Sequence, residues 1–123
     1  MKVLMIRPGK RPEKKEIEDA FECLQSAVEG YIEELSLFDD NAVILLNEEG
    51  KTLGLEPNRA VYDERGEVSD VIFGNFLIVG TDDEKGNYCS LSEEQLAKYE
   101  EMYKTPERFF RSGKRIIPVP VEQ

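Results

Sequence analysis

The segment Asn41-Ala42-Val43-Ile44-Leu45-Leu46-Asn47, NAVILLN at positions 41 to 47, decides the fold. Residues 42 to 46 are all apolar, so a strand formed here has no polar face to turn toward water. Such a strand belongs inside a sheet, because both of its faces need packed neighbours. We therefore predict a central strand with a helix on one face and a further layer on the other.

The segments on either side of NAVILLN are expected to pair with it. Residues 31 to 38 are rich in strand formers and precede it by Asp39-Asp40, which predicts an antiparallel pair. Residues 48 to 51 contain Gly50, which predicts a tight hairpin because glycine adopts the positive φ of such a turn. The chain would then return as a strand over residues 52 to 55.

The N-terminal part predicts a strand followed by a helix. Residues 2 to 6 form a short apolar run, and Pro8-Gly9 ends it. Asp19 and Glu22 have capping-box spacing, which favours a late helix start and leaves residues 14 to 18 to pair with the first strand. Gly30 is the predicted left-handed cap at the end of this helix. One apolar face at helical spacing supports the helix; its members are Ile17, Ala20, Phe21, Leu24, Ala27 and Val28.

The C-terminal half predicts a second helix. Ser92 and Gln95 form a capping box, and Pro106 ends the helix near Thr105. Before it, residues 64 to 67 predict a turn, and Gly74 predicts a bulge or a short helical turn before a strand over residues 76 to 79. The apolar stripe of this helix consists of Leu96, Tyr99, Met102 and Tyr103.

These elements predict an α+β fold, with a small, mainly antiparallel sheet, one helix after the first strands and a second helix near the C-terminus. A chain of 123 residues fits one domain, which we assign to residues 1–110. Residues 111–123 form a basic, proline-containing tail. This tail is either mobile or an extended segment laid on the domain or on a partner.

The charge balance limits the classes of partner. There are 26 acidic and 16 basic residues, a formal net charge of −10, so long-range attraction to nucleic acid is unfavourable unless the basic residues are segregated. Basic residues do crowd residues 2 to 15 and 104 to 115. Two interpretations remain: solvated charge at both ends of the chain, or a dipolar molecule that presents an anionic face to a basic partner.

The sequence favours a cytoplasmic protein. Its longest apolar run has the length of a strand and falls far short of the roughly 20 residues of a membrane span. The first eight residues do not resemble a secretory signal. Cys23 and Cys89 stand apart from each other, which predicts two ordinary reduced thiols.

Catalytic and metal-binding chemistry finds little support in the sequence. The chain has no histidine, which removes the usual general base and the commonest metal ligand. The acidic turns Asp82-Asp83-Glu84 and Asp39-Asp40 lack the spacing of a calcium loop, and no phosphate-binding glycine motif occurs. We predict no catalytic residue, no metal site and no cofactor.

The triplet Pro57-Asn58-Arg59 is the best candidate site. Arg59 has the geometry to clamp a carboxylate or phosphate, with Asn58 capping a short helical turn and Asn47 converging on the same rim of the sheet. The alternative is structural: Asn58 caps residues 59 to 62, and Arg59 pairs with Asp70 or a nearby glutamate inside the domain. Both interpretations stay open at this point.

Six short patterns in order resemble the DUF3846 family of small proteins over roughly residues 1 to 110. The resemblance implies an occurrence chiefly in phages, plasmids and other mobile elements of bacteria, largely Firmicutes, and it implies no catalytic residue. The patterns are Pro8-Gly9-Lys10, Gly30-Tyr31-Ile32, residues 47 to 51 (NEEGK), residues 54 to 60 (GLEPNRA), residues 70 to 76 (DVIFGNF) and residues 106 to 110 (PERFF).

Our first hypothesis is a non-catalytic accessory protein of a phage or mobile element that binds a host or phage macromolecule, with a counter-defence role as one version. We expect a protein partner more than nucleic acid, and a homodimer remains open. A further version is an acidic mimic of DNA, which requires carboxylates along one face; the candidates are Glu29, Glu33 and Glu34, or Glu93, Glu94, Glu100 and Glu101.

The second hypothesis is a small-ligand binder that sequesters a nucleotide or another anionic metabolite. Arg7, Lys10 and Arg59 would supply a positive pocket, and Tyr31 or Tyr62 would stack on a base. The third hypothesis is an enzyme that uses Tyr, Lys or carboxylate chemistry. No pair of such residues has a sequence spacing that indicates a catalytic site.

Overall fold

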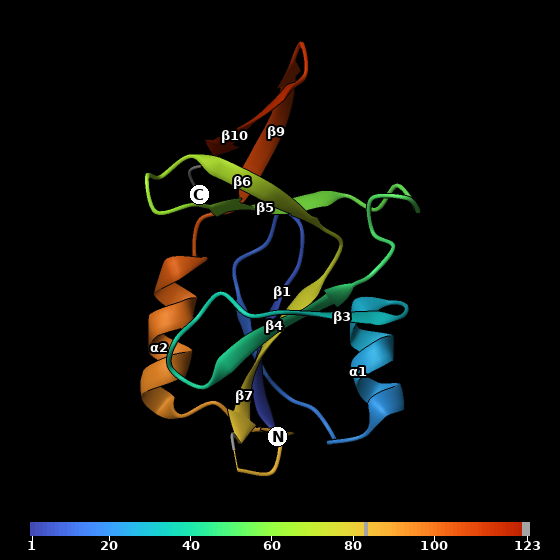
Figure 1. The fold of residues 1–123 in the computed structure, drawn as a ribbon, viewed down its shortest axis with the longest axis vertical. Helices are drawn as coiled ribbons and strands as arrows, with labels where there is room; N and C mark the ends of the chain where they lie inside the picture. The colour runs from blue at the N-terminus through green and yellow to red at the C-terminus, as the bar shows by residue number, and fades with distance from the viewer. Residues whose placement is uncertain (83, 122–123) are drawn as a thin grey trace.

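The NAVILLN segment forms β4 (Ala42–Asn47), an interior strand, as predicted. The computed structural model describes residues 1–82 and 84–121. β4 pairs antiparallel with β3 (Ile32–Leu35) on one edge and with β7 (Phe76–Asp82) on the other. The order of the sheet is β2-β1-β7-β4-β3, with β1 (Lys2–Ile6) and β2 (Glu13–Glu16) as its other members (Figure 1). β8 (Asn87–Cys89) pairs with the end of β7.

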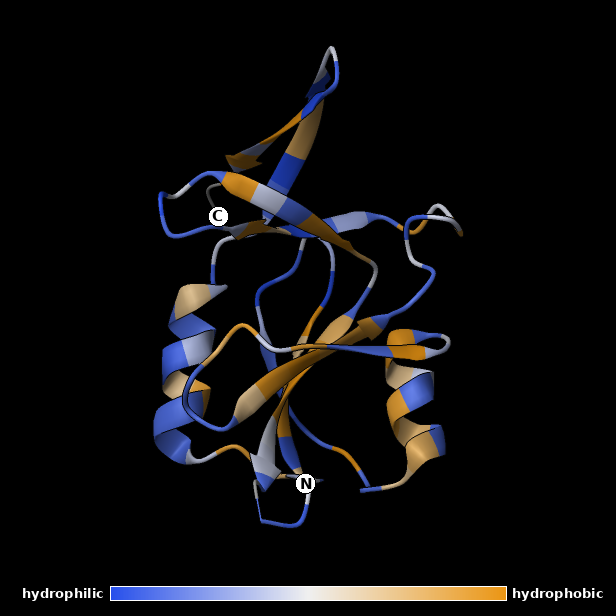
Figure 2. Cartoon of the chain, viewed as in Figure 1, coloured by the Kyte–Doolittle hydropathy of each residue, from blue (hydrophilic) through white to orange (hydrophobic). Residues whose placement is uncertain are grey.

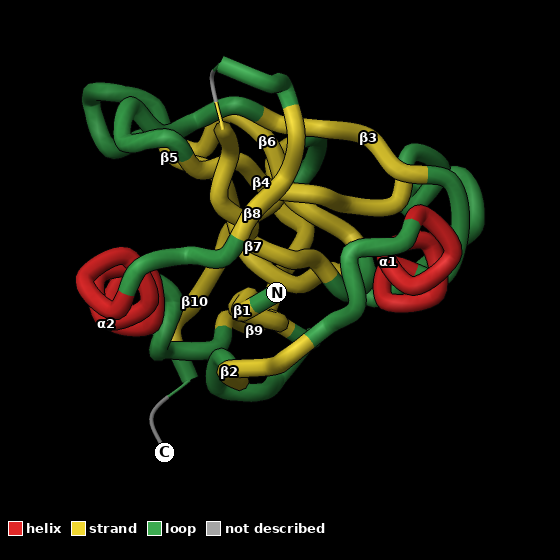
Figure 3. The backbone as a smooth tube through the Cα atoms, turned by 90° about the horizontal axis from the view of Figure 1, so that it is seen from below, coloured by secondary structure: helices red, strands yellow, loops and turns green. Residues whose placement is uncertain are grey.

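Alternating side chains of β4 divide the core into two layers. Val43 and Leu45 pack with α1 (Phe21–Val28), whereas Ala42 and Ile44 pack with α2 (Glu93–Met102). The two helices lie on opposite sides of the sheet (Figure 3). Apolar residues follow the central strands, α2 is mainly hydrophilic, and α1 mixes hydrophobic and hydrophilic residues (Figure 2). Each fully buried side chain of β4 stabilises the fold by roughly 1.5–3 kcal/mol.

Two further pairs of strands extend the molecule at one end. β5 (Pro57–Tyr62) and β6 (Val68–Phe73) form a two-stranded unit, the β5–β6 ribbon. β9 (Glu107–Ser112) and β10 (Arg115–Pro120) form a second, the β9–β10 hairpin. The ribbon lies across the end of the central sheet, and the hairpin projects beyond it (Figure 1). Val61 and Ile72 of the ribbon join the same core layer as α2.

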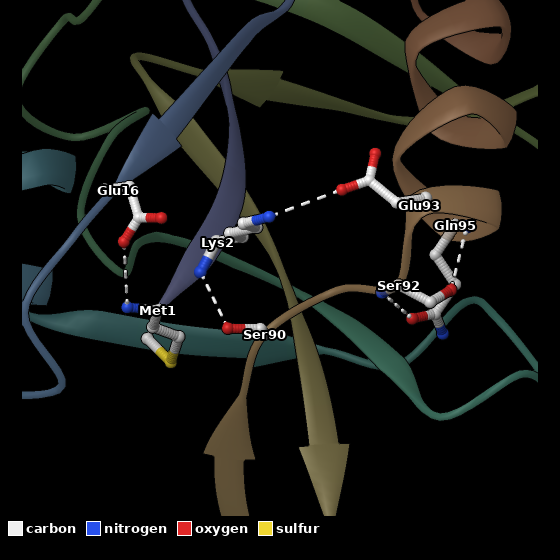
Figure 4. A network of polar contacts seen from close by, with 7 residues as sticks. All are labelled: Met1, Lys2, Glu16, Ser90, Ser92, Glu93 and Gln95. Atoms are coloured by element: carbon white, nitrogen blue, oxygen red, sulfur yellow. Dashed lines mark hydrogen bonds and ion pairs between the residues drawn. The ribbon is translucent and has the colours of Figure 1, made fainter.

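Polar contacts tie the start of the chain to the start of α2 (Figure 4). The main-chain N–H of Lys2 donates to Ser90 Oγ at 2.8 Å, and Lys2 Nζ donates to Glu93 at 3.4 Å. Ser92 and Gln95 form the predicted capping box, with reciprocal bonds of 2.9 and 3.1 Å. This confirms the helix start that the sequence predicted, and α2 ends at Met102, three residues before Thr105.

The prediction for α1 holds for its position and not for its caps. Residues 13 to 16 pair with β1, as the late helix start implied. Ala20, and not Asp19, is the N-cap residue, and no side chain caps this end. Glu29 adopts the left-handed conformation that was predicted for Gly30. Gly30 is required for another reason: a Cβ there would lie 2.6 Å from Asn47 Nδ2.

The predicted hairpin at Gly50 is wrong. Residues 48 to 54 form consecutive turns, with the N–H of Leu53 donating to the carbonyl of Glu49 at 2.8 Å. No strand forms over residues 52 to 55, because both edges of β4 are already occupied by β3 and β7. A Cβ on Gly50 would lie 2.7 Å from the carbonyl oxygen of Phe73, so this glycine permits a close approach to β6.

The C-terminal residues 111–120 are extended and paired, which is one of the two structures considered for the tail. The boundary at residue 110 is wrong, because it cuts through β9. Residues 122 and 123 of the predicted tail lie outside the described residues. The α+β fold with a mostly antiparallel sheet is confirmed. Neither helix in the described part of the chain has the length and apolar character needed to cross a membrane.

We predict that Leu45→Ala destabilises the protein by about 2–5 kcal/mol, since it opens a cavity in a fully buried layer. Urea unfolding followed by circular dichroism measures the change. Leu53→Ala is the matched control; Leu53 is 59% exposed, and its truncation should change stability by less than about 0.5 kcal/mol. Equal losses in both variants would contradict the central position of β4.

Candidate functional site

Asn47 is a structural residue at the junction of β4 and α1. Its Nδ2 donates to the carbonyls of Val28 and Glu29, both at 3.2 Å, and its Oδ1 accepts from the N–H of Glu49 at 2.8 Å. The side chain is buried. Asn47 therefore satisfies carbonyls that the end of α1 leaves without an intrahelical partner.

Asn58 is buried in β5, which is a strand and not the predicted helical turn. Its Nδ2 donates to the carbonyls of Ile6 at 3.0 Å and Gly74 at 2.8 Å. Its Oδ1 accepts from Arg59 Nη1 at 2.9 Å. Asn58 thus joins β1 and the β6–β7 corner to the ribbon, and no part of its amide faces solvent.

Arg59 is the largest fully buried side chain, with 1% of its surface exposed. Nε donates to the carbonyl of Tyr103, and Nη2 donates to the carbonyls of Tyr103 and Lys10. Nη1 donates to the carbonyl and to Oδ1 of Asn58. A guanidinium has five N–H donors, so these bonds, 2.7 to 3.3 Å long, use all of them.

The Arg59 guanidinium is therefore committed to the protein interior and is not an exposed clamp. The alternative partner Asp70 is also wrong, because Asp70 binds Lys51 Nζ at 2.6 Å. Burial lowers the pKa of Arg59, and the negative charge of Glu107 opposes that effect. Arg59 and Asn47 share no hydrogen-bond partner in the described structure, so they do not form one rim.

The remaining predicted residues are scattered. Arg7 is exposed and lies 3.8 Å from Glu13, and Lys10 contributes its carbonyl to Arg59. Tyr31 is exposed next to β3. Tyr62 is half-exposed at the end of β5, and its hydroxyl donates to Glu107 Oε2 at 2.6 Å. Of the set, only Asn58, Arg59, Tyr62 and the Lys10 main chain belong to one region.

Glu107 fastens the β9–β10 hairpin to β5. Its Oε1 accepts from the N–H of Ala60 at 2.9 Å, and its Oε2 accepts from Tyr62. Burial, together with the bond and the charge of Glu107, raises the pKa of Tyr62 to about 12. Burial and Glu107 also raise the pKa of Tyr103 to about 12, against the opposing charge of Arg59. Both phenols thus stay protonated at neutral pH.

Two cavities flank the hairpin, and sequence reasoning missed both. The first, the hairpin groove, has a volume of about 850 Å³ and lies between β6 and the hairpin. Four cations and two acids line it: Lys51, Arg111, Lys114 and Arg115, with Glu67 and Asp70. Its apolar walls include Val68, Val71, Phe73, Ile116, Ile117 and Pro118.

The second cavity, the β5 pocket, has a volume of about 520 Å³ and opens on the β5 side of the hairpin. It lies between the 36–41 loop, β5 and the end of α2. Its lining is mainly apolar and aromatic, and it includes Leu37, Phe38, Tyr62, Met102, Tyr103 and Pro120. Its other lining residues are Arg59, Ala60, Val61, Thr105 and Glu107.

Asp40 holds the loop that forms one wall of the β5 pocket. Its carboxylate accepts from the hydroxyl of Tyr99 and from Lys98 Nζ, and its carbonyl accepts from Gln95 Nε2. Burial raises the pKa of Asp40, but these bonds and the charge of Lys98 outweigh burial and leave the pKa below its ordinary value. The loop is therefore pinned to α2 by an ionised carboxylate.

No metal site is evident in the part of the chain that the structure describes. Within residues 1–82 and 84–121, no three His, Cys, Asp or Glu side chains are grouped to hold an ion. Asp83, one of the predicted acidic turn residues, lies outside this part. Cys23 is half-buried and Cys89 is exposed, and both are free thiols.

A family model described as a domain of unknown function, DUF3846, matches residues 1–104. The chain belongs to the DUF3846 family. No curated protein and no solved structure matches it. The match ends before β9, so the hairpin and the residues PERFF, which contributed to the resemblance, lie outside the matched range of this DUF3846 protein.

The sequence signal for the missed hairpin is weak. Gly113, which has φ +62, separates residues 107–112 from residues 115–120, but neither run, ERFFRS nor RIIPVP, alternates between polar and apolar residues along its length. The two prolines of the second run also disfavour a strand. The buried state of Arg59 had no local signal, because two of its four acceptor atoms, the carbonyls of Lys10 and Tyr103, lie in the β1–β2 turn and at the end of α2.

We predict that Arg59→Ala destabilises the protein by roughly 3 kcal/mol or more, since each buried acceptor that loses its donor costs about 1–3 kcal/mol. Urea unfolding measures the loss. Arg65→Ala, at an exposed position in the β5–β6 turn, is the control and should change stability by less than about 0.5 kcal/mol. An unchanged midpoint for Arg59→Ala would restore the interpretation as an exposed clamp.

We also predict a pH dependence from Asp40. Because its folded-state pKa is lowered, its contribution is complete above the unfolded-state pKa near 4 and is lost as pH falls through the lower folded value. Asp40→Asn should cost about 1–2 kcal/mol at pH 7, and the difference from the parent protein should shrink below pH 4. Denaturation between pH 2.5 and 7 tests this; a constant difference would contradict it.

Proposed function

We propose that this DUF3846 protein is a non-catalytic binding protein whose macromolecular partner is a protein that offers an acidic, apolar segment to the hairpin groove. The observation that carries the proposal is the cationic, apolar groove itself, in a chain whose net charge is −10. With four cations against two acids, its lining has a formal charge of +2. Such a local reversal of sign favours a partner segment rich in carboxylates.

The charge of the hairpin supports the same partner. Residues 107–120 contain four basic residues and Glu107, a formal charge of +3, so the other residues together carry −10 − 3 = −13. The hairpin is therefore a positively charged, projecting element of an otherwise acidic chain. Opposite charges on a partner would orient its approach and increase the association rate.

Exposed apolar side chains on the hairpin support a protein partner over nucleic acid. Phe110, Ile117 and Val119 lie on one face of the hairpin and are between 41% and 55% exposed. Interfaces between proteins combine apolar side chains with arginine, whereas affinity for nucleic acid comes mainly from phosphate contacts that the net charge disfavours.

The acidic residues offer less support for mimicry of DNA. The two candidate carboxylate groups lie on different elements, one at the end of α1 and on the edge strand β3, the other on α2 (Figure 1). Lysines interrupt the α2 group, since Lys2 pairs with Glu93 and Lys104 with Glu101. A continuous phosphate-like track is thus not evident in either group.

The biological setting is proposed on the family resemblance alone. It favours a phage or mobile-element accessory protein in the cytoplasm of a bacterial host, with counter-defence as one role. Arg108 and Arg115 lie on the same hairpin face as Phe110 and Ile117, so a symmetric homodimer through this face would bring cations of both copies into one interface, which is unfavourable. A different protein is therefore the partner we favour.

The test measures binding of a labelled ten-residue peptide that alternates Glu or Asp with Val, Ile or Leu. We expect the triple variant Arg111→Glu, Lys114→Glu, Arg115→Glu to bind at least tenfold more weakly, because it reverses the sign of the groove. Fluorescence anisotropy at two salt concentrations gives the dissociation constants, and the affinity of the parent protein should fall as salt rises.

The matched control is Lys10→Glu, Arg11→Glu, Lys14→Glu, which changes net charge equally at three exposed positions in and beside β2. It should alter the affinity by less than about threefold, an effect of net charge alone. Equal weakening in both triple variants would contradict the groove as the site. Tighter binding of a single-stranded oligonucleotide than of the peptide would contradict a protein partner.

A further inference from the structure

We propose that the β5 pocket binds an uncharged aromatic group that carries one hydrogen-bond donor, such as a phenol or an indole ring. This site is separate from the hairpin groove and does not depend on the function proposed for it. Its volume of about 520 Å³ lies within the range of about 300–1,000 Å³ that is usual for small-molecule sites.

The walls of the pocket favour an aromatic occupant. Phe38, Tyr62 and Tyr103 contribute three rings, and Met102 contributes a thioether. Aromatic rings pack against one another in offset or edge-on arrangements, and methionine sulfur makes favourable contacts with ring edges. Leu37 and Met102 line the pocket and are 43% and 51% exposed as whole residues, so an occupant that contacts them would remove apolar surface from water.

The charged residues of the lining disfavour an ion of either sign. Arg59 has no free N–H for an anion, because all five donate to acceptors of the protein. An anion would also lie near the Glu107 carboxylate, and a cation would lie near the Arg59 guanidinium. This differs from the anionic ligand expected from the sequence, since Arg7 and Lys10 do not line the pocket.

We expect a hydrogen-bond donor on the ligand because the Glu107 carboxylate can accept a hydrogen bond. Its two oxygens accept from Ala60 and Tyr62, whereas a carboxylate has about four lone-pair positions. Two of these positions are unused, and Glu107 lines the pocket, so it can accept a hydrogen bond from a ligand there. A phenol hydroxyl or an indole N–H meets that requirement without adding charge.

The test compares three probes built on the same benzene ring. The first is p-cresol. Toluene lacks its hydroxyl group, and 4-hydroxyphenylacetate adds a carboxylate. Titrations followed by amide shifts in ¹H–¹⁵N spectra give a dissociation constant for each. We expect p-cresol to bind at least fivefold more tightly than the other two, with shifts at residues around β5 and the end of α2. Equal or tighter binding of 4-hydroxyphenylacetate would overturn the proposal.

Leu37→Glu should weaken p-cresol binding at least fivefold, because it replaces an apolar wall of the pocket by a hydrated carboxylate. Leu53→Glu is the matched control, an exposed leucine that lines neither cavity, and should leave binding unchanged. Thermal unfolding of both variants establishes that they are folded. Unchanged binding to a folded Leu37→Glu protein would overturn the proposal. The groove triple variant should bind p-cresol normally, which separates the two sites.

Discussion

The positions of the β5–β6 ribbon and the β9–β10 hairpin depend on the hydrogen bonds of the buried Arg59 guanidinium. β5 and β6 pair only with each other among the described residues, and a two-stranded ribbon is marginally stable on its own. Arg59 and Asn58 fix this ribbon to the rest of the protein through carbonyls of Ile6, Lys10, Gly74 and Tyr103. These carbonyls come from β1, the β1–β2 turn, the β6–β7 corner and the end of α2.

Burial of a charge at this joint is tolerated because every donor is satisfied and a carboxylate is near. An isolated buried cation is costly, and hydrogen bonds to oriented carbonyls recover much of the lost hydration. Glu107 adds a compensating charge without a direct ion pair. The same residue fixes the hairpin through Ala60 and Tyr62, so docking of the ribbon also determines where the hairpin stands.

Sequence reasoning succeeded where the determining contacts are local and failed where they are distant. The apolar run of β4 and the capping box of α2 carry their information within a few residues. Pro57-Asn58-Arg59 has the composition of an exposed turn, yet its Asn and Arg are buried, because their partners lie 16 to 52 residues away, apart from the bonds between the two. Gly50 lies in a turn but failed as a hairpin signal, since pairing of β4 with β3 and β7 leaves no free edge for a returning strand.

The strand edges at the hairpin groove bear on how the proposed partner segment would be recognised. The N–H of Val71 donates to Asp70 Oδ1 at 2.8 Å, and Pro118 and Pro120 remove two donors from β10. Both features are typical of strands that resist pairing with another chain. A segment in the groove would thus be selected by side-chain charge and apolar contact, and less by extension of a sheet. This makes the identity of Arg111, Lys114 and Arg115 more important to recognition than the backbone of either strand.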